Sequence, residues 1–172
     1  ELTDVALSPS NVLYGIGFNA LYTVSQQTGA ATLLKNVSTG SINGADVSPD
    51  GTLWVSGGSE LATLDPQSGA VAFVASFPTG STSSGDLAWV GDRLLATAVG
   101  GGGDELVEFD VAGKSSKVLG PCGFGCIWGL AAYGATLYGL TCEGRVLAID
   151  TTTGAAKQLA TSTATFWGAS AR

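Results

Sequence analysis

The chain has 172 residues, a net charge of −7 and 26 glycines, and it contains no histidine. Its 7 basic residues are scattered, so we expect neither nucleic acid nor an anionic membrane surface as a partner. The absence of histidine excludes Ser-His-Asp and Cys-His catalysis and most zinc and copper sites. No apolar run approaches the roughly 18–20 residues of a membrane-spanning helix. The chain begins at Glu1 and has no methionine, which favours a mature, secreted product.

Four similar units of about 40 residues follow one another, and the first strand of a fifth unit comes after them. Each unit begins with a strand of small and apolar residues, which suits the crowded centre of a ring of blades. Three further strands follow in each unit, and none has helical spacing of apolar residues. The four predicted first strands are 4–7, 44–47, 86–89 and 128–131. The predicted units are 1–41, 42–83, 84–126 and 127–165, with a terminal strand at 166–172, all within one domain, 1–172.

The turns between the strands contain residues with specific backbone preferences. Ser48-Pro49-Asp50-Gly51 predicts a tight turn between the first and second strands of the second unit. Between the third and fourth strands, Asp65-Pro66-Gln67-Ser68-Gly69 and Asp150-Thr151-Thr152-Thr153-Gly154 place an Asp before a Gly. The Asp can accept backbone N–H bonds while the Gly takes a positive φ.

The Asp-x-x-Thr-Gly turn resembles that of bacterial secreted β-propeller repeats, namely the pyrroloquinoline-quinone-type and the YVTN surface-layer-type repeat families. The resemblance covers all four units, although the tryptophan usual in the quinoprotein repeat is missing. It implies an all-β fold, and we predict a small β-propeller with four four-stranded blades plus one extra C-terminal strand. Propellers of these families include cofactor enzymes, adhesins and scaffolds, so the fold alone does not choose a function.

The terminal strand copies the start of the fourth unit, because Trp167-Gly168 matches Trp128-Gly129. It can lie beside the N-terminal strand of its own ring, begin a fifth blade that another segment completes, or add to the edge of a neighbouring subunit. The last two outcomes give an oligomer or a filament. The predicted assembly strand contains Phe166, Trp167, Gly168, Ala169 and Ser170.

Three cysteines favour an oxidising compartment. Cys122 and Cys126 flank a Gly-Phe-Gly segment that permits a tight bend, and we predict this pair as the disulfide. The alternative is Cys126–Cys142, because these residues fall opposite each other if 128–132 and 136–140 form a hairpin. Three thiols without histidine make a metal site improbable.

Three carboxylates lie on or beside first strands: Asp4, Asp46 and Asp86. If these strands surround a channel, the carboxylates can converge and hold Ca²⁺, which prefers oxygen ligands. The competing interpretation, which we favour, is that each caps a loop or bonds between blades. We therefore predict no catalytic residue and no bound cofactor, with Ca²⁺ as the weak exception.

Other candidate sites have a structural explanation that we prefer. Gly100–Gly103, followed by Asp104 and Glu105, is a glycine-rich insertion that we interpret as a hairpin loop and not as a binding loop. Tryptophan and tyrosine side chains can stack on sugars, but more often they fill the wedges between blades. Asn36-Val37-Ser38 fits the N-glycosylation pattern, with Asn36 as the acceptor.

The function that we predict is that of a non-catalytic extracellular or cell-surface scaffold acting through protein contacts. The partner is a protein, most sharply a second copy of the chain bound through the terminal strand. The alternatives are a glycan- or small-ligand-binding propeller and, less favoured, a cation-dependent enzyme.

Overall fold

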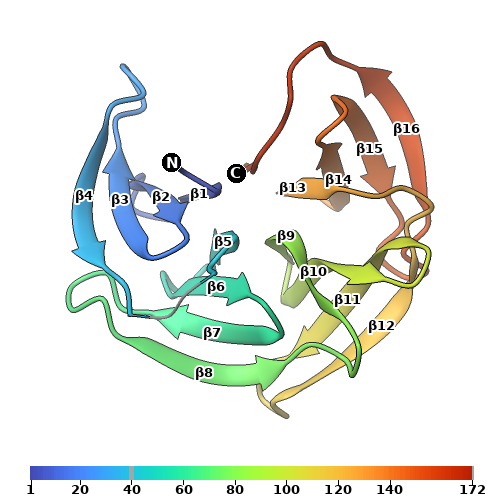
Figure 1. The fold of residues 1–172 in the computed structure, drawn as a ribbon, viewed down its shortest axis with the longest axis horizontal. Helices are drawn as coiled ribbons and strands as arrows, with labels where there is room; N and C mark the ends of the chain where they lie inside the picture. The colour runs from blue at the N-terminus through green and yellow to red at the C-terminus, as the bar shows by residue number, and fades with distance from the viewer. Residues whose placement is uncertain (39–40, 172) are drawn as a thin grey trace.

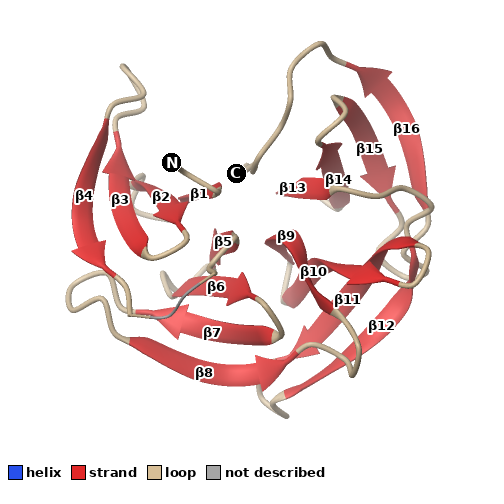
Figure 2. Cartoon of the chain, viewed as in Figure 1, coloured by secondary structure: helices blue, strands red, loops and turns tan. Residues whose placement is uncertain are grey.

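The structure is a computed structural model that describes residues 1–38 and 41–171. In these residues it contains 16 strands and no helix, arranged as four antiparallel sheets of four strands (Figures 1 and 2). The sheets follow one another around a common centre as the blades of a β-propeller, which confirms the predicted fold class. No helix long and apolar enough to cross a membrane occurs in the described residues.

Each blade is a meander in which successive strands pair, so the first strand is innermost and the fourth outermost. The strands of blade 1 are β1 (Asp4–Leu7), β2 (Leu13–Gly17), β3 (Ala20–Val24) and β4 (Ala31–Asn36). The strands of blade 2 are β5 (Gly44–Val47), β6 (Leu53–Gly57), β7 (Glu60–Leu64) and β8 (Val71–Ser76). The strands of blade 3 are β9 (Thr82–Val90), β10 (Arg93–Gly100), β11 (Gly103–Asp110) and β12 (Ser115–Pro121). The strands of blade 4 are β13 (Ile127–Tyr133), β14 (Thr136–Thr141), β15 (Arg145–Ile149) and β16 (Ala156–Thr161).

The core consists of three apolar wedges, one between each pair of successive blades. Ile16, Val47 and Leu53 belong to the wedge between blades 1 and 2. Phe77 and Phe109 contact each other edge to face at 4.9 Å between blades 2 and 3. Alternate residues of a strand point to opposite faces, so each blade can supply apolar side chains to both neighbours. Packing between the blades therefore holds the ring together.

The sector between blade 4 and blade 1 is occupied differently, and we call it the fifth sector. After β16 the chain turns inward, and residues 162–171, called the tail below, run to the centre beside the N-terminus (Figure 1). The tail forms no ladder with any described strand. It lies in its own ring, next to β1 and β13, which is the first of the three outcomes considered from the sequence.

Candidate functional site: the central channel and its mouths

The tail occupies the place of a fifth innermost strand. Close approaches of backbones define equivalent positions around the ring. A Cβ added at Gly44 would lie 2.9 Å from the Cα of Asp86, and one added at Gly129 would lie 3.1 Å from the carbonyl carbon of Gly168. One added at Gly168 would lie 2.7 Å from the Cα of Asp4. We call the ring formed by β1, β5, β9, β13 and the tail the inner ring. Its equivalent positions at this level are Asp4, Gly44, Asp86, Gly129 and Gly168.

Carboxylates from the inner ring bridge successive blades. Asp4 Oδ2 accepts the Ala45 N–H at 2.6 Å, and Asp86 Oδ2 accepts the Leu130 N–H at 2.5 Å. In both bonds the Asp is the acceptor. The donor is the backbone N–H of the residue that follows the equivalent position in the next innermost strand. The inner edge of an innermost strand has no neighbouring strand, so its N–H groups need other acceptors. The two carboxylates supply them and connect blade 1 to blade 2 and blade 3 to blade 4.

A second type of bridge lies two residues further along the inner strands. Asp46 Oδ2 accepts the Trp89 N–H at 2.8 Å, which connects blade 2 to blade 3. In the tail, Ser170 Oγ accepts the Leu7 N–H at 3.0 Å, which connects the tail to blade 1. Ser170 thus makes the same kind of contact from the fifth position as Asp46 makes from the second.

Two of these carboxyl groups are deeply buried. Asp4 is 2% exposed and Asp86 is fully buried. Burial raises the pKa of Asp4 well above its usual range, and the negative charge of Asp86 raises it further. Burial also raises the pKa of Asp86, against the hydrogen bonds that favour its charged form. Both groups accept backbone hydrogen bonds from buried positions, and both therefore ionise less readily than an exposed carboxyl.

The three predicted carboxylates therefore lie in the inner ring, where each accepts backbone N–H bonds. In residues 1–38 and 41–171, no group of three or more His, Cys, Asp or Glu side chains is placed to hold a metal ion. The hydrogen bonds between blades agree with the structural interpretation that we favoured. Calcium binding stays a prediction.

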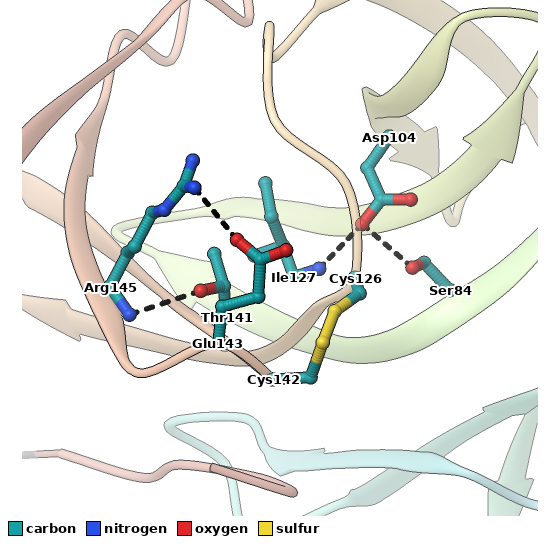
Figure 3. The surroundings of a disulfide bond; sticks show 8 residues. All are labelled: Ser84, Asp104, Cys126, Ile127, Thr141, Cys142, Glu143 and Arg145. Atoms are coloured by element: carbon teal, nitrogen blue, oxygen red, sulfur yellow. Dashed lines mark hydrogen bonds and ion pairs between the residues drawn. A yellow bond between two sulfur atoms is a disulfide. The ribbon is translucent and has the colours of Figure 1, made fainter. Parts of the chain in front are cut away.

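The glycine-rich insertion is a tight hairpin between β10 and β11, and Asp104 at its base points into the protein. Asp104 Oδ2 accepts the Ile127 N–H at 2.6 Å and the Ser84 hydroxyl at 2.8 Å (Figure 3). Burial raises the pKa of this carboxyl. Asp104 thus holds the start of β13 to blade 3, a role that was not predicted from the sequence.

The disulfide joins Cys126 to Cys142, and the predicted Cys122–Cys126 pair is wrong (Figure 3). Cys126 and Cys142 face each other across the open end of the β13–β14 hairpin, with Cα atoms 5.6 Å apart. The Cys142 N–H also donates to the Cys126 carbonyl at 3.0 Å. Cys122 is a buried free thiol, and burial raises its pKa to about 12. The alternative pairing is thus correct, because cross-strand geometry prevails over sequence proximity.

Tryptophans occupy two different environments. Trp54 and Trp89 pack edge to face, 5.8 Å apart, in the wedge between blades 2 and 3, as expected for core residues. Trp128 and Trp167 lie with ring centroids 4.9 Å apart where blade 4 meets the tail. This aromatic contact stands at the junction where blade 4 has Gly129 in place of a bridging Asp. Trp167 remains 53% exposed.

The residue before each equivalent position of the inner ring faces one mouth of the channel. A hollow of about 200 Å³ there is called the aromatic mouth below. Its lining residues are Thr3, Phe18, Asn43, Ser84, Gly85, Trp128 and Trp167. The opposite mouth is a hollow of about 460 Å³ whose lining includes the residue three places after each equivalent position. Those residues are Leu7, Val47, Trp89, Ala132 and Ala171. All five members of the inner ring, the tail included, therefore contribute to both mouths.

Only Trp128 and Trp167 among the residues that line the aromatic mouth were singled out from the sequence, and two of the others stand out in the structure. Phe18 is the turn residue between β2 and β3, and its side chain is 52% exposed. Asn43 precedes β5, and its Oδ1 atom is buried without a hydrogen-bond partner. An alignment of the repeated units could have pointed to Asn43, because it occupies the position in the second unit that Trp128 occupies in the fourth. The predicted glycosylation acceptor, Asn36, ends β4 and is exposed, and its modification stays a prediction.

Comparison with known proteins yields structures but no family. No family model and no curated protein sequence matches the chain. The extracellular domain of a putative hybrid two-component system from B. thetaiotaomicron is 17% identical, with a TM-score of 0.57 over 96% of this chain and 24% of the other. A chain of a nidogen/laminin complex is 16% identical, with a TM-score of 0.67 over 96% of this chain and 66% of the other.

A puromycin hydrolase mutant in complex with PGG is also similar, at 18% identity and a TM-score of 0.56 over 90% of this chain and 28% of the other. The chain thus spans about a quarter of the first of these proteins and about two thirds of the second. The neighbours include extracellular domains, a member of a protein complex and an enzyme, so the likeness shows the β-propeller fold alone.

Proposed function

We propose that the protein is a non-catalytic extracellular scaffold that acts through protein contacts, and that a second copy of the chain docks in its fifth sector. The observation that carries this proposal is the incomplete fifth sector, which holds an innermost segment but no described strand outside it. The disulfide and the extracellular domains among the structural neighbours support an extracellular location.

The tail has hydrogen-bonding capacity left over. Among the described residues, 165–171 take part in no backbone–backbone hydrogen bond, and the bond from Leu7 to Ser170 uses a side chain. An unpaired backbone segment is a template for an added strand. Part of its edge faces a hollow of about 250 Å³ between β1 and the tail, lined by Leu2, Val5 and Phe166 among others.

The two walls of the fifth sector are apolar. On blade 1, Ile16 packs into the wedge with blade 2, so its neighbour Gly15 faces the other way, toward the fifth sector. A Cβ added at Gly15 would contact Leu2 and Val24, which places these two side chains on the same face. Leu33 lies on the same face, since its neighbour Leu34 packs into that wedge, and Leu33 is 52% exposed. On blade 4, a Cβ added at Gly129 would contact Leu140 beside the tail. Between blades 1 and 2, 2 and 3, and 3 and 4, the apolar faces pack against each other instead.

A second copy suits these walls better than a partner of opposite charge would. The side chains named above on the two walls, those of Leu2, Val24, Leu33 and Leu140, carry no charge. The chain as a whole has a net charge of −7. Two copies can therefore bring these apolar residues together without placing like charges opposite each other, while the exposed Lys157 lies at the outer strand of the blade 4 wall. A two-fold axis would bring the walls of one copy against the same walls of the other, which is a self-complementary arrangement.

The test is the oligomeric state, measured by size-exclusion chromatography with light scattering over a range of protein concentrations. We expect a mass above that of a monomer, rising with concentration. Leu33→Lys places a charge on the exposed part of the wall and should return the protein to a monomer. The matched control is Phe73→Lys, because Phe73 lies at the corresponding place in β8 of blade 2, is 58% exposed and lies outside the fifth sector. A wild-type protein that stays monomeric at every concentration would refute self-docking, as would a Leu33→Lys variant that still assembles.

A further inference from the structure

We infer that the aromatic mouth is a binding site for a neutral sugar ring, a hexopyranoside. This inference is independent of the proposed self-docking, because the mouth lies on the channel axis and uses residues from all five members of the inner ring. At about 200 Å³, the hollow suits one small ligand and not an extended one.

The walls of the mouth suit a ligand with an apolar face. Phe18 and Trp167 are 52% and 53% exposed, although both are large apolar side chains that folding tends to bury. Trp128 packs against Trp167 at a tilt of 33°, so the two indoles lie together at the border of the hollow. The face of an aromatic ring is electronegative, and it attracts the weakly positive C–H groups that one side of a pyranose presents. Three aromatic side chains from blade 1, blade 4 and the tail thus border one hollow.

The polar groups of the mouth suit hydroxyl donors. Asn43 Oδ1 is buried and has no hydrogen-bond partner, while its amide group makes a long contact of 3.4 Å with the Ser83 carbonyl. A buried acceptor without a donor is costly, so a ligand O–H that reaches it gains the energy of that bond. Ser84 Oγ donates to Asp104, which leaves its lone pairs as further acceptors.

Electrostatics favour a neutral ligand. None of the residues that line the mouth is charged. A charged ligand would lose its hydration there without an ionic partner. A hexopyranoside has an apolar face, a rim of hydroxyl groups and no charge. These properties match the aromatic walls, the free acceptor atoms and the uncharged lining of the mouth.

The experiment is saturation-transfer NMR and calorimetric titration of the intact protein with the methyl α- and β-pyranosides of glucose, galactose, mannose and N-acetylglucosamine. We expect saturable binding of at least one of them. Phe18→Ala should weaken that binding about tenfold, because an aromatic contact of this kind is lost. Asn43→Ala should weaken it about fivefold through the lost hydrogen bond. Phe18 is an exposed turn residue, so its replacement should leave the fold intact.

The control variant is Tyr133→Ala, because Tyr133 is 66% exposed and lies at the other end of the inner strand that carries Trp128. It should bind as the wild type does. The inference is overturned if no pyranoside binds, or if Phe18→Ala binds as tightly as the wild type. It is equally overturned if N-acetyltyrosinamide binds through Phe18 while the sugars do not, since the mouth would then hold a protein side chain.

Discussion

The junction between blades 3 and 4 and the junction between the tail and blade 1 occupy equivalent places in the ring but differ in chemistry. At the first, the buried Asp86 accepts the N–H groups of Leu87 and Leu130, and an apolar wedge packs outside it. At the second, Ser170 accepts the Leu7 N–H alone, and the described residues form no blade outside the tail. The inner ring thus continues through the fifth sector, while the stabilising wedges stop at blade 4.

This difference indicates how the stability is distributed. A carboxylate that accepts two buried N–H groups leaves both without a partner when it is removed, whereas a serine hydroxyl leaves one. The junction of the tail should therefore be weaker, and it should open at a lower free energy than the blades do.

Asp86→Ala should have the largest effect. It orphans the N–H groups of Leu87 and Leu130 and leaves a cavity, and we expect a loss of about 4 kcal/mol in the free energy of unfolding. Urea denaturation followed by far-UV circular dichroism measures it. Asp92→Ala, which changes an exposed aspartate of the same blade, should alter stability little. Equal stability of the two variants would show that the carboxylate bridge does not stabilise the ring.

Loss of the disulfide should be the next largest effect. Among the described residues, blade 4 has a complete neighbouring blade on one side, and the Cys126–Cys142 bond holds its hairpin together. A cross-link that closes a loop of about 15 residues is worth about 3 kcal/mol, so Cys126→Ser with Cys142→Ser should cost that amount. Cys122→Ser retains the bond and is the control for thiol removal. If the double variant unfolds at the same urea concentration as the wild type, blade 4 does not depend on the bond.

Stability should also depend on pH in a direction set by the buried carboxyls. The pKa values of Asp4 and Asp86 are raised in the folded protein above the ordinary value of 3.8, so their contribution to stability is full below that pH and is lost as pH rises through the folded values. Each unit of pKa shift corresponds to about 1.4 kcal/mol. We expect the free energy of unfolding to be higher at mildly acidic pH than at pH 8.

Two measurements separate this effect from that of other acids. Asp4→Asn removes one of the two titrating groups and should flatten the decline of stability toward high pH. Glu108 behaves in the opposite way, since its hydrogen bond to Arg93 lowers its pKa to about 2. The stability that it contributes is present above the ordinary pKa of 4.5 and is lost as pH falls toward 2. An Asp4→Asn variant with the same decline as the wild type would contradict our assignment.

Ser170→Ala should have the smallest effect, about 1 kcal/mol, because one partly buried hydrogen bond is lost. The informative measurement is hydrogen exchange at the Leu7 amide, which should accelerate, whereas exchange at the Leu130 amide should not change. Acceleration at both amides would mean that the tail and blade 4 open as one unit, and the contrast between the two junctions would disappear.

The sequence predicted the repeated unit, the four-stranded blades and the tail because these depend on local patterns. Small residues recur in each first strand, and the turn glycines Gly29, Gly69, Gly113 and Gly154 recur every 40 to 44 residues. Trp167-Gly168 copies Trp128-Gly129, and the two tryptophans indeed lie side by side, 4.9 Å apart, in neighbouring positions of the inner ring. The predicted pair Cys122–Cys126 was wrong because the register of the β13–β14 hairpin, and not nearness along the chain, brings Cys126 and Cys142 together.

The sequence by itself determined that this is an all-β repeat protein without histidine-based catalysis, because periodicity and composition can be read without knowing which units meet. Only the tertiary structure decided that Asp4, Asp46 and Asp86 bridge blades, and that Phe18 and Asn43 share a hollow with Trp167. Partners such as Asp86 and Leu130 lie 44 residues apart in the chain. Their meeting depends on how the blades pack around the axis, which no local pattern contains.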